Sequence, residues 1–366
     1  MERKPRVILF SPTFNDRSKW DYELHYLQGT GGSEANHIEL GGTLSQLGHE
    51  VISYAPIPEH KHGTTYNGVT WFMDRGADST HEGVWIFYRT IVPLDFMHKT
   101  DKQKFCVYMH DVSIGEAWTD ERIQKIDKVL VQCEKHKWLM GEMYPRIKDK
   151  LLVVKPGLDL NRFLKIEEEN KGIIRDPKSI IWASSPIRGL QHLLDIFLEA
   201  KEFVPELTLD IFYGFDYFDD RIPEHKKVRE KVIEYSTYPG INYHGKIGKD
   251  KLALEWLQHG LWVYPTMFLE TFCMASVEAQ AMGAIPIVNP LWGTGENVKF
   301  GNLITGNAYD DPLVQARYVE AIIAFADNPE LQDQIREKMM PQIREAYSWE
   351  NLGPAWSEMI EAIWES

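Results

Sequence analysis

Residues 264–283 read YPTMFLETFCMASVEAQAMG, and the fold prediction rests on this stretch. An apolar run ends at Tyr264, a loop follows, and an alanine-rich segment that begins near Thr271 reads as a helix over residues 272–282. Gly283 ends that helix, and the apolar run 285–288 follows directly. Because a strand, a helix and a further strand in this order form a βαβ unit, the stretch predicts parallel strands covered by helices.

The same alternation extends over the rest of the chain. In the second half we expect strands at residues 180–183, 207–212, 241–243 and 261–264, and helices at 190–203, 226–235 and 249–259. In the first half we expect strands at residues 7–10, 50–55, 84–88, 105–109, 129–133 and 151–154, and a helix at 33–47. The polar stretch 156–176 interrupts the pattern and is expected to be a linker. The fold class is therefore α/β, with two Rossmann-like doubly wound domains.

The composition is typical of a globular protein from a reducing compartment. The chain has 43% hydrophobic residues and a net charge of -14, most of it carried by residues 156–366. Its three cysteines show no paired spacing, so neither a disulfide framework nor a zinc site is expected. We find no signal-peptide core and no apolar stretch of about 20 residues, and therefore expect a cytoplasmic protein. An acidic chain without a basic stripe also argues against nucleic acid as a partner.

Cations concentrate between Arg122 and Lys155 in the first half of the chain. A solvated helix face explains them best. The alternative is a face that contacts anionic lipid, which would place the protein peripherally at the inner side of a membrane.

Two carboxylates in the opening stretch, Glu270 and Glu278, are candidate ligand-binding groups. Glu270 lies in the loop before the predicted helix, where it can accept hydrogen bonds from sugar hydroxyls, although it also fits simple charge complementarity with a helix N-terminus. Glu278 lies among alanines and Val277, where a carboxylate needs a partner, and it can accept a pair of hydrogen bonds from ribose hydroxyls. The first-turn amides between them, at Thr271, Phe272 and Cys273, suit a phosphate.

Three further candidates follow other predicted strands. Gly31 and Gly32 precede the first helix and would let the backbone approach a pyrophosphate, although a glycine pair is also an ordinary turn. His110, beside Asp111, comes at the end of a strand, which favours a ligand-binding edge over a buried structural role. The segment Ser184-Ser185-Pro186-Ile187-Arg188 places one cation where it can neutralise a leaving group.

Together these motifs resemble glycosyltransferase family 4. The two glutamates seven residues apart, followed by AQAMGAIPIV at 279–288, are similar to the signature of that family. Further similar segments occur in the family's order, namely Thr30–Glu34, His110-Asp111, Pro156-Gly157-Leu158-Asp159 with Phe163, residues 289–297 with Trp292, and Ser348-Trp349-Glu350. The resemblance covers nearly the whole chain. It implies a GT-B fold, with two Rossmann-like domains facing a central cleft.

The resemblance also implies domains and residue roles. Residues 1–160 would bind the acceptor, residues 161–347 would bind the nucleotide sugar, and residues 348–366 would form a helix that packs back on the first domain. His110, Glu270 and Arg188 would be catalytic. The donor would contact Gly31, Gly32, Ser184, Ser185, Arg188, Gly245, Lys246, Ile247, Glu270, Thr271, Phe272, Cys273 and Glu278, with the base held at Gly245–Ile247.

One departure concerns the phosphate clamp. The family usually carries an arginine and then a lysine here, whereas this chain has Ser185 and then Arg188. Lys246 and the hydroxyls of Ser184 and Ser185 are candidates to compensate. The sequence has no Asp-x-Asp motif and no metal-ligand cluster, so neither a cofactor nor a metal is expected.

The sequence thus predicts a retaining, metal-independent hexosyltransferase. It would move a sugar from a UDP-sugar, with UDP-glucose preferred, to a saccharide or polyprenyl-linked acceptor in envelope or extracellular polysaccharide synthesis. The alternatives are a nucleotide-sugar epimerase or phosphorylase of the same architecture, and a nucleotide-sugar-binding protein without transferase activity. A dehydrogenase is disfavoured because no Gly-x-Gly-x-x-Gly follows the first strand.

Overall fold

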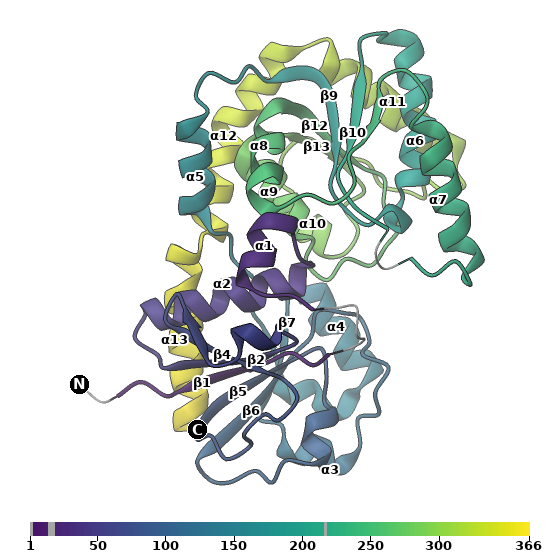
Figure 1. Ribbon diagram of the computed structural model, residues 1–366. Coiled ribbons are helices and arrows are strands. Elements are labelled where there is room, and N and C mark those ends of the chain that lie inside the picture. Colours follow the sequence, from purple (N-terminus) through teal and green to yellow (C-terminus); the bar gives the residue numbers. More distant parts are fainter. Residues whose placement is uncertain (1–2, 14–18, 216–217) are drawn as a thin grey trace. The chain divides into compact units, whose positions relative to one another are not determined.

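The computed structural model describes residues 3–13, 19–215 and 218–366, which form two compact units. Unit 1 comprises Met1–Tyr26, Thr30–Asp159 and Ala346–Ser366, and unit 2 comprises Leu27–Gly29 and Leu160–Glu345. Each unit is built around one largely parallel sheet, and the C-terminal helix α13 (Trp349–Glu365) belongs to unit 1 (Figure 1).

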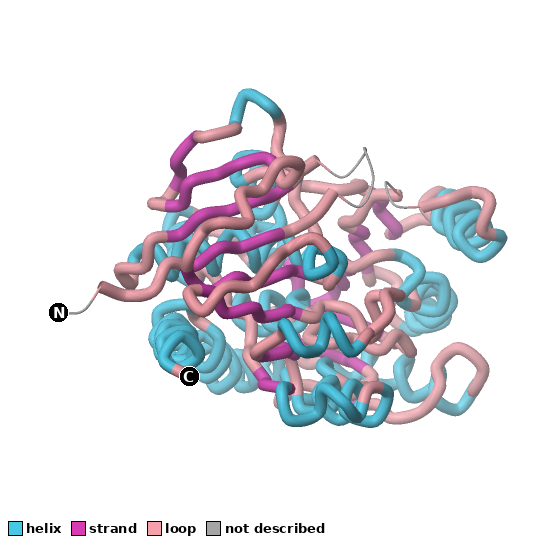
Figure 2. The backbone as a smooth tube through the Cα atoms, turned by 90° about the horizontal axis from the view of Figure 1, so that it is seen from below, coloured by secondary structure: helices cyan, strands magenta, loops and turns pink. Residues whose placement is uncertain are grey.

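Unit 1 contains an eight-stranded sheet (Figure 2). Its order is β3 (Thr64–Tyr66), β4 (Val69–Met73), β2 (Val51–Ala55), β1 (Val7–Phe10), β5 (Gly83–Tyr88), β6 (Gln103–Tyr108), β7 (Lys128–Val131) and β8 (Leu151–Val153). Its helices are α1 (Tyr22–Gln28), which begins in this unit, α2 (Gly32–Gln46), α3 (Asp120–Lys125), α4 (Glu134–Met143) and α13. Three 3-10 turns complete it, η1 (Glu59–Lys61), η2 (Val92–Asp95) and η3 (Pro145–Lys150).

The antiparallel hairpin β3–β4 is an element that the alternation pattern did not reveal. Its two-residue turn is Asn67-Gly68, and both residues have positive φ, 47° and 74°. Asparagine and glycine tolerate this conformation, which a tight hairpin of this kind requires. The Asn-Gly pair was therefore a local signal for the hairpin.

Two apolar cores cover the two faces of this sheet. One core joins α2 and α13 to the strands and buries Trp349, Trp356, Ile360 and Ile363 of α13. In Figure 1, α13 (yellow) lies beside α2 (purple), and Trp349 Nε1 donates to Glu39 Oε2 at 2.9 Å across 310 positions of sequence. The other core lies on the opposite face, where α3, α4 and η2 pack. The burial of α13 explains why a segment so distant in sequence belongs to unit 1.

Unit 2 contains a six-stranded parallel sheet. Its order is β11 (Ile241–Tyr243), β10 (Thr208–Ile211), β9 (Asp176–Trp182), β12 (His259–Tyr264), β13 (Ile285–Val288) and β14 (Asn302–Leu303). Its helices are α5 (Leu160–Glu169), α6 (Leu190–Phe203), α7 (Pro223–Tyr235), α8 (Lys249–Gln258), α9 (Met274–Met282), α10 (Gly293–Asn297), α11 (Pro312–Ala326) and α12 (Pro329–Tyr347), with the turn η4 (Pro186–Arg188). The predicted strands and helices of this half lie within these elements or a few residues from their ends.

The expected linker at 156–176 is wrong, because most of it folds. Helix α5 occupies residues 160–169, and its Phe163 is buried. The charged run at 167–169 forms the more exposed end of this amphipathic helix, and Glu167 pairs with Arg344 at 2.9 Å. The polar residues of this stretch therefore form the solvent-exposed face of a helix and not an irregular linker.

Candidate functional site

The predicted donor-binding segments of unit 2 lie at one edge of its sheet. They follow the carboxyl ends of β9, β11, β12 and β13, which run parallel and therefore end on the same side. In open α/β sheets this edge is where ligands bind. The structure thus brings together, on one side of unit 2, loops that follow strands as far apart in the sequence as β9 and β13.

Glu270 lies at the centre of this edge and is held by two donors. Arg188 donates from Nη1 to both carboxylate oxygens, at 2.9 and 3.1 Å, and the Tyr264 hydroxyl donates to Oε1 at 2.6 Å. Glu270 is 4% exposed, whereas the Arg188 side chain is 35% exposed. A carboxylate has about four acceptor positions. Three are used here, so one position on Oε2 is left for a ligand hydroxyl.

The charges of this cluster are fixed by its surroundings. Burial lowers the pKa of Arg188, but the negative charge of Glu270 outweighs it and raises the pKa above its usual value. Burial, reinforced by the charge of Glu270, raises the pKa of Tyr264, and burial likewise raises the pKa of the Cys273 thiol. Arg188 is therefore a permanent cation, Tyr264 remains a donor, and Cys273 is no nucleophile at neutral pH.

The loop that carries Glu270 is longer than predicted, because α9 begins at Met274 and not near Thr271. Cys273 adopts a left-handed conformation, with φ of 71°, which the helical pattern of the sequence could not indicate. Gly293 approaches this loop closely, and its amide donates to the Glu270 carbonyl at 2.8 Å. A Cβ at Gly293 would lie 2.8 Å from Phe272 backbone atoms, so glycine is required there.

Glu278, in the second turn of α9, forms a second buried carboxylate–cation pair. Its Oε1 pairs with Lys249 Nζ, and its Oε2 accepts from Trp256 Nε1 at 3.4 Å. The predicted need for a partner is therefore met inside the protein. Sequence analysis missed Lys249. The sequence signal for Lys249 was its position at the start of a helix. The helix dipole disfavours a cation there, so a lysine at this position indicates a specific role.

The other predicted donor contacts lie in the segments that follow β9 and β11. Ser184 is buried and its carbonyl accepts from Trp182 Nε1 at 2.6 Å, while Ser185 precedes η4. Gly245, Lys246 and Ile247 lie in the loop after β11, where Gly245 has a φ of 70°. Trp292 has a positive φ of 55° and precedes α10.

In unit 1, His110 lies just after β6 in a neutral state. Burial lowers its pKa well below the usual value, and the charge of Arg89 adds to this effect. The amide nitrogen of Gln132 lies 2.8 Å from His110 Nδ1. An amide nitrogen can only donate, so Nδ1 accepts and the ring proton is on Nε2. His110 is thus arranged as a neutral hydrogen-bond donor.

Arg89, which the sequence did not single out, links Asp111 to Ser33, the residue after the glycine pair. Arg89 follows β5 and donates from Nε to Asp111 at 2.6 Å and from Nη1 to Ser33 at 3.3 Å. The carboxylate of Glu34 lies over Gly31, where a Cβ would be 2.3 Å from Oε2. Gly31 and Gly32 were expected to let a pyrophosphate approach the backbone closely. At Gly31, the carboxylate of Glu34 occupies that space. The sequence signal that could have identified Arg89 was the position of a cation directly after a predicted strand.

The described residues contain neither a helix that could span a membrane nor a group of three metal ligands. Within the described ranges, every helix is too short or too polar to cross a bilayer. Over the same part of the chain, no three His, Cys, Asp or Glu side chains are grouped as metal ligands.

The chain is similar to several known proteins over all or part of its length. It matches lipopolysaccharide 1,2-N-acetylglucosaminetransferase of Salmonella typhimurium with 27% identity over 194 residues, which is 52% of this chain and 49% of that protein. Sucrose-phosphate synthase of Thermosynechococcus elongatus has a similar structure, with a TM-score of 0.72, 13% identity, and coverage of 98% of this chain and 99% of the other. The fold is GT-B.

Further comparison adds a ligand-bound GT-B structure. HepE of Anabaena, solved in complex with UDP-glucose, matches with a TM-score of 0.70 and 14% identity, over 97% of this chain and 99% of HepE. The matches span about half the length of the curated relatives. A comparison with models of known families finds no match.

Proposed function

We propose that this chain is a retaining hexosyltransferase that uses a UDP-sugar donor, with UDP-glucose preferred. The acceptor would be a saccharide or a polyprenyl-linked saccharide, and the product would enter envelope or extracellular polysaccharide. The similarity to a lipopolysaccharide transferase and to a GT-B protein that binds UDP-glucose supports this choice of donor and role.

The geometry of Arg188 is the observation that carries the proposal. Its Nη1 is pinned to Glu270, while within the described residues its Nε and Nη2 have no hydrogen-bond partner. The planar guanidinium therefore presents a fork of donors that matches two oxygens of a phosphate. A side chain that is 35% exposed can reach a ligand, and its permanent charge suits a diphosphate leaving group.

Lys249 offers a second positive charge for the same donor. Its pairing with Glu278 leaves the carboxylate oriented by two donors, so its remaining acceptor positions can take ribose hydroxyls. We assign Lys249 the part of the clamp that Ser185 cannot supply. Lys246, the alternative in the loop before α8, follows Gly245 and would lie nearer the base.

The reaction follows from these charges. The acceptor oxygen bonds to the anomeric carbon on the face that the nucleotide leaves, and the bond from that carbon to the β-phosphate oxygen breaks. The electron pair stays on the phosphate, where Arg188 stabilises it, and the phosphate takes the acceptor's proton. Glu270 holds a sugar hydroxyl, and neutral His110 donates from Nε2. No metal takes part, and no covalent enzyme intermediate forms.

The proposal includes contact with a membrane surface. Several cations between Arg122 and Lys155 are used inside the protein, since Arg122 pairs with Asp95 and Lys150 donates to the Ile126 carbonyl. What supports a membrane contact is Trp138 of α4, which is 61% exposed and lies between Lys137 and Leu139.

A donor screen tests the function. UDP-glucose should raise the melting temperature more than ADP- or GDP-glucose, and the chain should hydrolyse it slowly without acceptor and equally well in EDTA. Glu278→Ala should weaken UDP binding, whereas Glu270→Ala should mainly lower turnover. Lys249→Met should weaken UDP binding as well, and Lys251→Met on the outer part of α8 is the matched control.

The outcomes separate the alternatives. Stabilisation by UDP-glucose without hydrolysis or transfer would favour a nucleotide-sugar-binding protein. Conversion of the free UDP-sugar to an isomer would favour an epimerase. Stabilisation by none of the nucleotide sugars would refute the assignment.

A further inference from the structure

One face of the unit 1 sheet lacks helices over β1 and β5. Residues 74–82 join β4 to β5 without a helix, and the connection from β5 to β6 contains only the four-residue turn η2. Crossover connections in doubly wound domains normally carry helices that cover the sheet. Here the two short connections border this face of the sheet, and a hollow remains between them.

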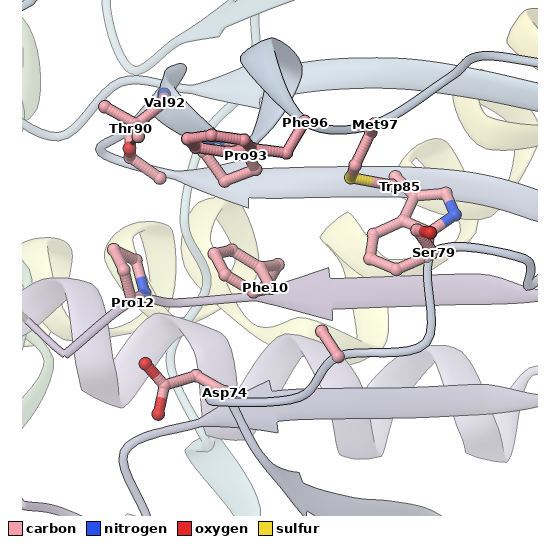
Figure 3. Close-up of a pocket in the computed structure, with 11 residues that line it drawn as sticks. Phe10, Pro12, Asp74, Ser79, Trp85, Thr90, Val92, Pro93, Phe96 and Met97 are labelled. Atoms are coloured by element: carbon pink, nitrogen blue, oxygen red, sulfur yellow. Dashed lines mark hydrogen bonds between the residues drawn. The ribbon is translucent and has the colours of Figure 1, made fainter.

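This hollow is a pocket of about 360 Å³ whose walls are mostly apolar (Figure 3). The size is within the range of small-molecule sites. Phe10 and Trp85 form its floor, and Phe96 and Val92 at the rim are 77% and 40% exposed. The pocket is lined by Phe10, Pro12, Asp74, Ala77, Ser79, Trp85, Thr90, Val92, Pro93, Phe96 and Met97.

The two ends of the pocket differ in chemistry. Asp74, Pro12 and Thr90 lie at the carboxyl ends of the strands, whereas Trp85 and Ser79 lie at the other end (Figure 3). Asp74 is fixed by Thr13, whose amide and hydroxyl donate to its two oxygens at 2.7 and 3.0 Å. The polar end therefore faces the same sheet edge as Arg89 and His110, and the apolar end extends away from that edge.

We propose that this pocket binds the apolar aglycone of the acceptor, an aryl group attached to the sugar that receives the new residue. The inference rests on the proposed function. A purely saccharide occupant is disfavoured, because its hydroxyls would lose water against Phe10, Trp85 and Met97 without gaining partners. An apolar group gains from covering exposed Phe96 and Val92, while the attached sugar lies beside Asp74.

Calorimetric titration with two simple probes tests the pocket without any donor. Phenyl β-glucoside should bind at least tenfold more tightly than methyl β-glucoside. Phe96→Ala should weaken phenyl glucoside binding by about fivefold, the scale of one aromatic contact. Ser79→Phe, which adds a ring at the exposed end of the pocket, should abolish the preference for phenyl. Phe203→Ala, at a phenylalanine of unit 2 that is 65% exposed, is the matched control and should leave binding unchanged.

Donor hydrolysis in the same samples separates the two proposals. Equal binding of the phenyl and methyl probes, or unchanged phenyl binding in Phe96→Ala and Ser79→Phe, would overturn the inference even if UDP-glucose is hydrolysed. Phe96-dependent phenyl binding by a chain that neither binds nor hydrolyses any nucleotide sugar would overturn the proposed function and keep an apolar-ligand pocket. Transfer to phenyl glucoside with a lower KM than to methyl glucoside, and a raised KM in Phe96→Ala, supports both.

Discussion

Arg188 is the residue that links the buried carboxylate of Glu270 to the proposed phosphate site. Its Nη1 donates to the buried carboxylate of Glu270, and its guanidinium carbon lies 4.4 Å from the Phe268 ring centroid. These two contacts restrict the directions in which the remaining donors can point. Preorganised donors of this kind cost little reorganisation when charge develops on a leaving group.

Arg188→Lys should therefore impair turnover more than donor binding. Lysine can neutralise Glu270, but a single ammonium cannot also supply the fork of two donors. We expect kcat to fall by about 10²–10³, the usual effect of losing one such donor, with a donor KM that changes less. Steady-state kinetics with UDP-glucose measures both.

Arg221→Lys is the control for this substitution. Arg221 is 90% exposed and pairs only locally with Asp219, so kcat should be unchanged. An unaltered kcat in Arg188→Lys would mean that Arg188 is not the phosphate clamp.

Buried neutral histidines make unit 1 sensitive to acid. Burial lowers the pKa of His37 to about 3 and that of His136 to about 4, both from an unfolded value of about 6.5. The unfolded chain thus binds more protons below pH 6.5, so stability is full above that pH and is lost as the pH falls towards the folded pKa values. Each histidine should cost about 1.4 kcal/mol at pH 5.5.

Thermal melts at pH 7.5 and 5.5 check this prediction, because most carboxylates stay ionised in that window. The melting temperature of unit 1 should be lower at pH 5.5. His37→Gln should be less stable at pH 7.5, since His37 bonds both Ser11 and Ser53, but should show a smaller loss between the two pH values. An equal loss in parent and variant would contradict the assignment.

The sequence could single out candidate residues but not their partners. It placed Glu278 in an apolar setting that demands compensation, yet the cation is Lys249 on another helix, 29 positions away. Nothing local links two residues that meet only when α8 and α9 pack on the sheet. For the same reason, the sequence did not indicate that the carboxylate of Glu34 lies over Gly31.

At the scale of elements, periodicity was a good guide wherever the strand or helix was buried on a regular pattern. Helix α6 was predicted at its observed bounds, Leu190–Phe203, because its apolar face repeats cleanly. The start of α9 was predicted two residues too early, since the left-handed Cys273 is imposed by its neighbours and not by its own preference. Element type is thus encoded locally, whereas the loops that hold the site depend on tertiary packing.

Gly157 illustrates a packing requirement between elements of unit 1. A Cβ at Gly157 would lie 2.4 Å from the indole of Trp349, at the start of α13. Because an indole in a buried site cannot shift freely, Gly157→Ala should displace Trp349 and lower the melting temperature, at a cost of about 1–3 kcal/mol.

Gly172→Ala provides the comparison. No atom lies within 4 Å of a Cβ at Gly172, and its φ is not in the left-handed region, so this substitution should be neutral or slightly stabilising. Equal melting temperatures for the two variants would show that Trp349 has room to move.

At the scale of the whole molecule, the chain returns at its end to the unit in which it began. The C-terminal helix fills one face of the unit 1 sheet, where Trp356 is 3% exposed and donates from Nε1 to the Lys155 carbonyl at 2.9 Å. The chain order alone did not require this arrangement, which was expected from the family resemblance. The proposed donor groups Arg188, Lys249 and Glu278 all belong to unit 2, so the two units can be perturbed separately.

Trp356→Ala should therefore destabilise unit 1 and leave UDP binding by unit 2 nearly unchanged. Removing a buried indole leaves a cavity that costs about 3–5 kcal/mol, all of it within unit 1. We expect the first thermal transition to shift to a lower temperature, while the affinity for UDP at 20–25 °C stays within twofold of the parent as long as the protein remains folded. Trp138→Ala, at an indole that is 61% exposed, should leave both measurements unchanged. If Trp356→Ala weakened UDP binding in proportion to its loss of stability, the donor site would depend on unit 1 as much as on unit 2, and the assignment of the phosphate clamp to Arg188 and Lys249 alone would be wrong.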